Sequence, residues 1–324
     1  MLIDRGVIKV GLEIEIPKWN GRTYPQVAAD LVEADYMLGP PEQWAEHHKY
    51  HCTCTQGGCK EVRSGNLIVP PLVSLTYDGS LPKTGAEFIV SPILLSEMQL
   101  QRQLGEIWEI ITRNAVWSMD LPDYQGHEGK ASPSIHLHVS ANLNKNEEYE
   151  NTTPNSTFTT DILHALSLFS PEFILLADHD NFRRGLQYRI PSRQYIHADQ
   201  MHHGFIDVRS SKPNAIVYIE WRLFEAVFDD WEYLENAVYM SAGITRSFLN
   251  MDTISRMMAT GYSNTYSDSE LWAACQSDQT EKALHMVNRE RLNFLRTICL
   301  DELDDDPYAV KVIHRIFDRA EAKI

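Results

Sequence analysis

The second half of the chain contains a short stretch, residues 218–224, in which apolar residues alternate with a charged pair. Side chains alternate between the two faces of a β-strand, so Glu220 and Arg222 would share one face. The opposite face would carry Ile219, Trp221 and Leu223, which suit a core. A buried carboxylate and guanidinium are costly unless they meet each other, a metal ion or a charged ligand. The pattern therefore predicts a strand with one functional face.

Two earlier stretches have the same construction. Near the N-terminus, Glu13 and Glu15 share one face of a predicted strand whose other face is apolar. In the middle of the chain, His136 and His138 share a face in the same way. Each of the three predicted strands thus carries two ionisable groups on one face. If the three strands belong to one sheet, their ionisable side chains gather on one face of it, and that face is a candidate functional site.

The remaining pattern predicts the elements around these strands. Residues 7–16 form the first strand, and a helical pattern through residues 27–32 follows it. An Asp-Gly turn predicts a hairpin between residues 67–77 and residues 85–92, with Glu87 in the returning strand. Further helices are expected at residues 96–115, at residues 158–176 with a break at Pro171, at residues 231–251, and after start signals near residues 267, 277 and 307.

Length and charge narrow the functional classes. The chain has 324 residues, and 43% of them are hydrophobic, which is enough for a large core. It has 29 basic and 45 acidic residues, and its net charge of −16 argues against a protein that binds a phosphate backbone. It contains neither a signal pattern nor an apolar run near the roughly 20 residues that span a bilayer. We expect a cytoplasmic protein with no nucleic-acid or membrane partner.

An insertion at about residues 39–60 is rich in proline, histidine and glycine and contains three of the five cysteines. Cys52, Cys54 and Cys59, with a nearby histidine such as His51, have the spacing of a small tetrahedral zinc site. A solvent-exposed loop whose thiols bind nothing would have the same spacing by chance. A structural Zn²⁺ and an empty loop therefore both stay open, and neither is catalytic.

The predicted functional face suggests divalent metal ions. It would bring together Arg222, as a fixed cation, and the candidate ligands Glu13, Glu15, Glu87, His136, His138 and Glu220. Carboxylates in such number repel one another unless cations neutralise them, and hard oxygen ligands suit Mg²⁺ or Mn²⁺. Such ions commonly hold ATP and neutralise charge on its γ-phosphate. The chain has no glycine-rich phosphate loop of the Walker or dinucleotide type, so ATP would be held through metal ions.

Four motifs, in their order along the chain, resemble those of the amidoligases. They are Glu-Ile-Glu at 13–15, Asp-Gly-Ser followed by Gly-Ala-Glu-Phe-Ile-Val-Ser-Pro at 78–92, His-Leu-His-Val-Ser at 136–140, and Ile-Glu-Trp-Arg-Leu-Phe-Glu at 219–225. Amidoligases are carboxylate–amine ligases related to glutamine synthetase and glutamate–cysteine ligase. The chain is most similar to the type that is common in bacterial and phage genomes. The resemblance runs from about residue 11 to residue 238.

The resemblance implies an α+β fold in which a curved antiparallel sheet has helices on its convex side. ATP and two or three Mg²⁺ ions, or Mn²⁺, would bind on the concave side. By position, the metal ligands would be Glu13, Glu15, Glu87, His136 or His138, and Glu220. Arg222 would contact the transferring phosphate and act with Glu220 in catalysis. Arg184 and Tyr188 lie where the family has an arginine-rich loop for phosphate or substrate, although such arginines can also pair with surface acids.

On this interpretation residues 1–250 form an amidoligase-like catalytic domain that contains the Cys/His insertion. Residues 251–324 form a helical extension packed on the same domain. The expected reaction joins a small-molecule or peptide carboxylate to an amine through an acyl phosphate, at the expense of ATP. A homo-oligomer is compatible with the sequence. Two alternatives stay open: a metal-dependent hydrolase that uses the histidine pair, and a non-catalytic amidoligase-like scaffold, for example in a phage particle.

Overall fold

The chain divides into two compact units. The N-terminal unit contains residues 11–135 and 226–231, and the C-terminal unit contains residues 1–10, 136–225 and 232–324. The computed structural model describes residues 7–16, 18–22, 24–34, 62–64, 67–69, 73–76, 86–95, 104–116, 134–142, 156–177, 206–208, 217–225, 230–261, 267–276 and 280–324.

Six strands form one antiparallel sheet in the order β5-β6-β1-β8-β10-β9. They are β1 (Val7–Ile16), β5 (Val73–Thr76), β6 (Ala86–Leu94), β8 (Ser134–Asn142), β9 (Ile206–Val208) and β10 (Val217–Glu225). The three strands predicted to carry ionisable pairs, β1, β8 and β10, are therefore neighbours in one sheet. With the helices described below, this confirms the predicted α+β class. The curvature of the sheet stays a prediction.

In the N-terminal unit the predicted hairpin pairing is confirmed. Strands β5 and β6 are antiparallel, with Val73 opposite Val90 and Thr76 opposite Glu87. The predicted strand 67–77, however, is two strands, because β4 (Leu67–Val69) pairs with β3 (Val62–Ser64) in a separate ladder. Pro70 and Pro71 stand between β4 and β5 in the sequence, and a proline has no N–H to donate to a continuous ladder.

Two helices and a short strand pair complete the described part of the N-terminal unit. Helix α1 (Tyr24–Glu33) confirms the helical pattern there, and α3 (Gly105–Asn114) is the described part of the helix predicted at 96–115. Strand β2 (Lys18–Trp19) pairs with β7 (Ala115–Val116).

Arg22 ties the short segment after β2 to both helices. Its guanidinium donates to both carboxylate oxygens of Asp30 in α1, at 2.6 and 3.0 Å, and to the amide oxygen of Asn114 in α3, at 2.9 Å. The hydrogen bonds from Arg22 hold the pKa of Asp30 below its usual value. The pair is part-exposed, so it is a surface clamp rather than a core feature.

The C-terminal unit is mainly helical. Its helices are α4 (Ser156–Ser167), α5 (Ser170–Leu176), α6 (Trp231–Ser247), α7 (Met251–Gly261), α8 (Asp268–Gln276), α9 (Thr280–His285), α10 (Arg289–Leu303) and α11 (Pro307–Glu321). The break predicted near Pro171 is confirmed, since α4 ends at Ser167 and Pro171 lies in the first turn of α5. The helix predicted at 231–251 ends at Ser247, slightly early. No helix in the described ranges is long and apolar enough to cross a membrane.

Local capping explains where two of these helices begin. Before α8, Ser267 and Glu270 form a reciprocal capping box: the Ser267 N–H donates to the Glu270 carboxylate, and the Glu270 N–H donates to the Ser267 hydroxyl. Before α11, the Asp306 carboxylate accepts from the N–H groups of Tyr308 and Ala309, and Pro307 occupies the first turn. Both starts were predicted from the sequence.

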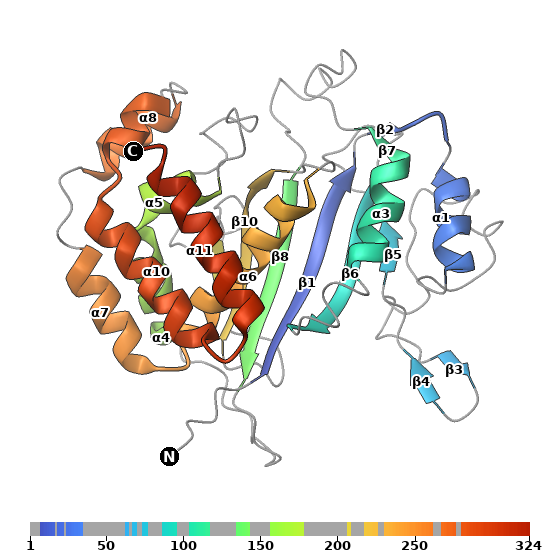
Figure 1. The fold of residues 1–324 in the computed structure, drawn as a ribbon, viewed down its shortest axis with the longest axis horizontal. Helices are drawn as coiled ribbons and strands as arrows, with labels where there is room; N and C mark the ends of the chain where they lie inside the picture. The colour runs from blue at the N-terminus through green and yellow to red at the C-terminus, as the bar shows by residue number, and fades with distance from the viewer. Residues whose placement is uncertain are drawn as a thin grey trace. The chain divides into compact units, whose positions relative to one another are not determined.

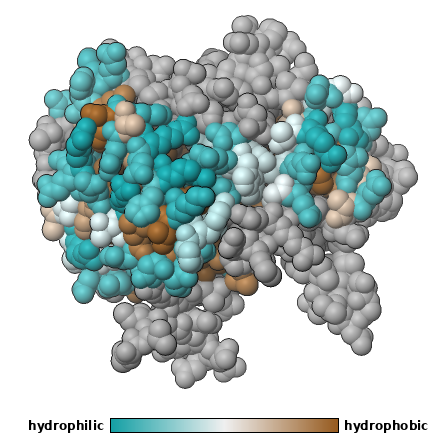
Figure 2. All heavy atoms as spheres, viewed as in Figure 1, coloured by the Kyte–Doolittle hydropathy of each residue, from teal (hydrophilic) through white to brown (hydrophobic). Residues whose placement is uncertain are grey.

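Helices α10 and α11 each bury one face and expose the other, whereas α5 and most of α6 are buried on all sides. Helix α11 lies beside α10 and buries Ala309, Val312, Ile313, Ile316, Phe317 and Ala320 (Figure 1). The outer surface over α10 and α11 is mostly hydrophilic (Figure 2). Helices α6 and α10 approach closely at Gly243, where an added Cβ would lie 3.1 Å from the α-carbon of Cys299. A larger residue at position 243 would therefore push these helices apart.

A fully buried ion pair joins α5 to α10. One oxygen of Glu172, Oε1, accepts from Nε and Nη2 of Arg291 at 3.0 and 2.7 Å, and from the N–H of Asn288 at 2.8 Å. Both side chains have 0% exposure. Burial raises the pKa of Glu172, while the charge of Arg291 opposes that rise. The sequence analysis did not predict this pair.

Candidate functional site

Strand β10 is held in place through its apolar face. Ile219, Trp221 and Leu223 are all fully buried, as their alternation predicted. The indole N–H of Trp221 donates to the Thr245 hydroxyl of α6 at 3.2 Å, and its ring meets Phe173 of α5 edge-on at 5.5 Å. Helices packed against this face leave the other face of β10 to the polar residues.

The polar face of β10 carries a compact charged group. Oε1 of Glu220 lies 3.1 Å from Nε of Arg222 and 3.8 Å from Nδ1 of His136 on β8. Glu220 and His136 are buried, with side chains 2% and 6% exposed, whereas Arg222 is 24% exposed. The imidazole and the carboxylate are adjacent but too far apart for a direct hydrogen bond. Oε1 of Glu220 and Nδ1 of His136 are close enough to bind the same cation.

Asp207 on β9 belongs to the same region, and the sequence analysis missed it. It is the register partner of Glu220 in the antiparallel pair β9–β10, and it is 4% exposed. Directly opposite residues of such a pair share a face, and like charges there repel. The only sequence signal was a single aspartate in the short apolar run Phe205-Ile206-Asp207-Val208. Two buried carboxylates therefore lie on adjacent strands.

His138 has a different neighbour from His136. Its Nδ1 makes a short hydrogen bond with the hydroxyl of Tyr218 on β10. The two rings stack, with centroids 6.0 Å apart and planes inclined by 25°. Tyr218 is 3% exposed. The structure thus separates the two histidines of the motif: one lies beside a carboxylate and the other beside a phenol.

The predicted ligands of the N-terminal unit lie on β1 and β6. Oε2 of Glu15 accepts from the N–H and the hydroxyl of Ser134, both at 2.8 Å, so this carboxylate has a structural partner. Glu13 and Glu87 are partly buried. No ligand role of any predicted residue is decided by these contacts, and the roles stay predictions.

The other predicted site residues lie outside the described residues. They are Arg184 and Tyr188 of the arginine-rich segment and Cys52, Cys54, Cys59 and His51 of the insertion. Phosphate binding by the first group and zinc binding by the second stay predictions.

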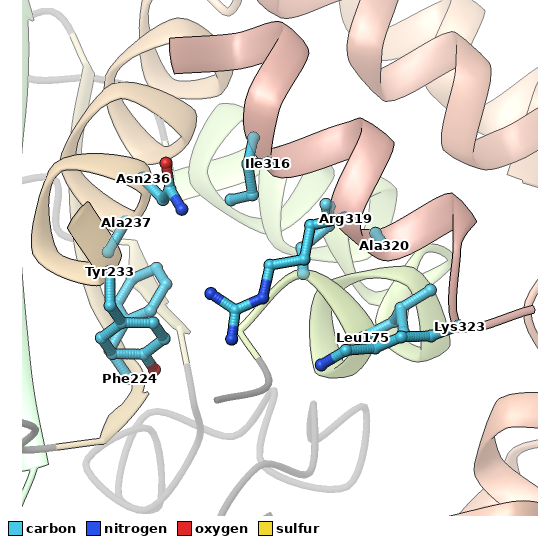
Figure 3. Close-up of a pocket in the computed structure, with 10 residues that line it drawn as sticks. Leu175, Phe224, Tyr233, Asn236, Ala237, Ile316, Arg319, Ala320 and Lys323 are labelled. Carbon is cyan, nitrogen blue, oxygen red and sulfur yellow. The ribbon is translucent and has the colours of Figure 1, made fainter. Parts of the chain in front are cut away.

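A small pocket also lies in the C-terminal unit, where α5, the end of β10, α6 and α11 meet (Figure 3). It has an empty volume of about 310 Å³, part of which is open solvent. Phe224 and Tyr233 form an aromatic wall, and the guanidinium of Arg319 extends toward them (Figure 3). None of the predicted ligands lines it.

No protein-family model matches the chain, and no curated protein matches its sequence. Among solved structures, the chain is similar to a crystal structure of a novel glutamine synthase homolog, with 13% sequence identity and a TM-score of 0.33. The match covers 98% of this chain, which spans 65% of the length of that structure. These values do not assign the chain to a family.

Proposed function

We propose that the chain is an ATP- and Mg²⁺-dependent carboxylate–amine ligase that forms an amide through an acyl phosphate. The observation that carries the proposal is the buried carboxylate of Glu220, which has the Arg222 guanidinium and the His136 imidazole as neighbours on one sheet face. The four motifs that resemble those of amidoligases supply the reaction class.

The charge balance around Glu220 supports a bound cation. An ionised carboxylate that leaves water is costly unless opposite charge lies nearby. Arg222 supplies one positive charge, but Asp207 on the next strand brings a second negative one. A divalent cation bound by Glu220 and His136 would add positive charge beside both carboxylates. Glu13 stays a candidate ligand because it belongs to the first of the four motifs.

The donor set is compatible with the metal ions proposed. Carboxylate oxygens favour Mg²⁺ or Mn²⁺, and one imidazole among them is better matched to Mn²⁺. When bound, such ions would neutralise charge on the phosphates of the nucleotide. Both ions are therefore used in the experiments below.

Arg222 would act on the phosphoryl group. Its Nε lies against Glu220, which fixes the plane of the guanidinium, and its partial exposure leaves it within reach of a ligand. We propose that it stabilises negative charge on the γ-phosphoryl group while a substrate carboxylate attacks. An amine then attacks the resulting acyl phosphate, phosphate leaves, and the nitrogen loses a proton to give the amide. Water must be excluded at this stage because it would hydrolyse the acyl phosphate.

Trapping with hydroxylamine tests this proposal, because hydroxylamine can replace the natural amine whatever its identity. The full chain is incubated with ATP, Mg²⁺ or Mn²⁺, hydroxylamine and pools of carboxylic acids, and ADP and hydroxamate are measured. We expect equal amounts of both products with at least one pool, and neither product with Arg222→Ala. Metal-dependent hydrolysis of esters or amides without nucleotide would instead favour a hydrolase. An absence of ATP binding under all conditions would favour a scaffold.

A further inference from the structure

The pocket of the C-terminal unit has a mostly apolar, buried lining and a basic edge (Figure 3). Arg319 and Lys323 form that edge and are half-buried, and no carboxylate is among the described residues that line the pocket. The whole chain has a net charge of −16, so a pocket with two cations and no acid reverses the overall sign of charge locally. Its electrostatics therefore suit an anion.

The acids on the neighbouring helix turns have other partners. Asp318 and Glu321 of α11 pair with Arg296 of α10, at 2.7 and 3.4 Å. Glu235 of α6 pairs with Arg315 of α11 at 3.3 Å. None of these three carboxylates lines the pocket. The packing of α11 against α6 and α10 thus keeps the acids away from the two cations at the pocket edge.

Asn236 of α6 adds a neutral hydrogen-bond donor to the pocket. Its side-chain oxygen accepts from Nε and Nη2 of Arg315 at 3.0 and 2.8 Å, and a guanidinium can only donate, so the orientation of the amide is fixed. The amide nitrogen then lies on the pocket side, toward the guanidinium of Arg319 (Figure 3). Asn236 is 3% exposed, and no described residue accepts a hydrogen bond from that nitrogen. Such a buried donor is costly unless an acceptor reaches it.

An acceptor placed between Asn236 and Arg319 would take hydrogen bonds from both, whereas two donors cannot bond to each other. A carboxylate matches the planar fork of a guanidinium, and Lys323 supplies a second positive charge. The rings of Phe224 and Tyr233 meet edge-on beside this place, with centroids 6.4 Å apart, and suit contact with another ring. We propose that the pocket binds a small aromatic carboxylic acid, with its carboxylate between Asn236 and Arg319 and its ring against the aromatic wall.

The size of the pocket limits this ligand. Its empty volume of about 310 Å³, part of which is open solvent, is at the lower end of the range for small-molecule pockets. A single ring with a carboxylate fits such a volume better than a nucleotide does. None of the residues assigned to ATP or metal ions lines the pocket, so the inference goes beyond the proposed ligase and does not depend on it.

Titration with benzoate, followed by NMR of the ¹⁵N-labelled full chain, tests the site. We expect the side-chain amide signal of Asn236, identified by its absence in Asn236→Asp, to shift and to saturate. Acetate, which lacks the ring, and benzyl alcohol, which lacks the charge, should each bind at least about tenfold more weakly. Benzoate that leaves the Asn236 signal unchanged would overturn the proposal, and so would equal affinity for benzyl alcohol.

Two variants test the donors separately, with affinity measured on the NMR signals of benzoate itself. Asn236→Asp keeps the oxygen that accepts from Arg315 and replaces only the donor nitrogen, so its added negative charge should weaken benzoate binding by at least about tenfold. Asn293→Asp adds the same charge on the exposed face of α10 and should stay within about twofold of wild type. Arg319→Gln changes a half-buried side chain and should also cost about tenfold or more, which keeps the test decisive if Asn236→Asp does not fold. Unchanged benzoate affinity in Arg319→Gln would contradict the proposal.

Discussion

Two carboxylates of the C-terminal unit are almost completely buried, yet their surroundings differ. Glu172 meets one guanidinium of equal and opposite charge, and two donors of Arg291 and one backbone N–H converge on its Oε1. Glu220 lies beside the Arg222 guanidinium and the His136 imidazole, and a second carboxylate, Asp207, lies opposite it on the adjacent strand. The first group is a pair of opposite charges, whereas the second brings two carboxylates together on adjacent strands.

The difference separates a structural ion pair from a candidate site. A buried pair whose opposite charges cancel and share several hydrogen bonds can join two helices without a further ion, even though Oε2 of Glu172 has no hydrogen-bond partner among the described residues. A buried group with excess negative charge is stable only if a proton or a cation balances it. Glu172 therefore suits a structural role, whereas cation binding is what we propose for Glu220.

The largest effect is expected at the structural pair. Glu172→Gln should lower the free energy of unfolding by about 3–5 kcal/mol, because it leaves the Arg291 guanidinium buried without its counter-charge. Denaturant-induced unfolding measures this change. The double variant Glu172→Leu/Arg291→Met removes both charges and should be more stable than either single variant. If the loss of unfolding free energy in the double variant equals the sum of the losses in the two single variants, the two residues do not act as one unit.

The second effect sharpens the contrast at the site. Glu220→Gln should reduce Mn²⁺ affinity by at least about 100-fold. Removing a residue that only hydrogen-bonds to a metal ligand costs up to about 100-fold, and the loss of a ligand itself should cost no less. Its free energy of unfolding should change by less than about 1 kcal/mol, since Arg222 is partly exposed and can turn to water. Metal titration and denaturant unfolding on the same preparation measure both quantities. A large loss of stability with unchanged metal affinity would make Glu220 a second structural residue.

The smallest effect is expected at the part-exposed pair of the N-terminal unit. Because Arg22 lowers the pKa of Asp30 below its ordinary value of 3.8, the pair stabilises the fold above that pH and the contribution is lost as the pH falls through the lowered pKa. Arg22→Ala should remove about 0.2–1 kcal/mol near neutral pH and less in strong acid, where only the hydrogen bonds of Arg22 to neutral acceptors such as Asn114 remain. Unfolding curves of both proteins across this acid range provide the measurement. If the difference in unfolding free energy between wild type and Arg22→Ala grows as the pH falls, the predicted pH dependence is wrong.

Much of the fold and part of the candidate site could be predicted from local sequence patterns. The alternation around Glu220 predicted the buried face of β10, and the same alternation predicted β1 and β8 as strands with one apolar face. That the three strands lie in one sheet was implied only by the family resemblance. The start signals at Ser267 and Asp306 were confirmed, because a helix cap depends on residues three or four positions apart. The Asp-Gly turn predicted the pairing of β5 with β6.

What could not be predicted depends on contacts between distant residues. Glu172 and Arg291 are 119 positions apart, and the sequence showed only one acid in the apolar run of α5. His138 and Tyr218 are 80 positions apart, and their contact follows from a strand register that alternation does not fix. Asp207 was missed for the same reason, since its position opposite Glu220 is also a matter of register.

The central claim is that the sheet face around Glu220 binds nucleotide through divalent metal. Calorimetric titration of the metal-stripped chain with a non-hydrolysable ATP analogue, with and without Mg²⁺, tests it most directly. Wild type and Glu220→Gln are compared, and Glu270→Gln, whose carboxylate caps an exposed helix start, is the matched control. The account predicts Mg²⁺-dependent binding in wild type and the control, and none in Glu220→Gln. Binding that needs no metal, or that survives in Glu220→Gln, would contradict it.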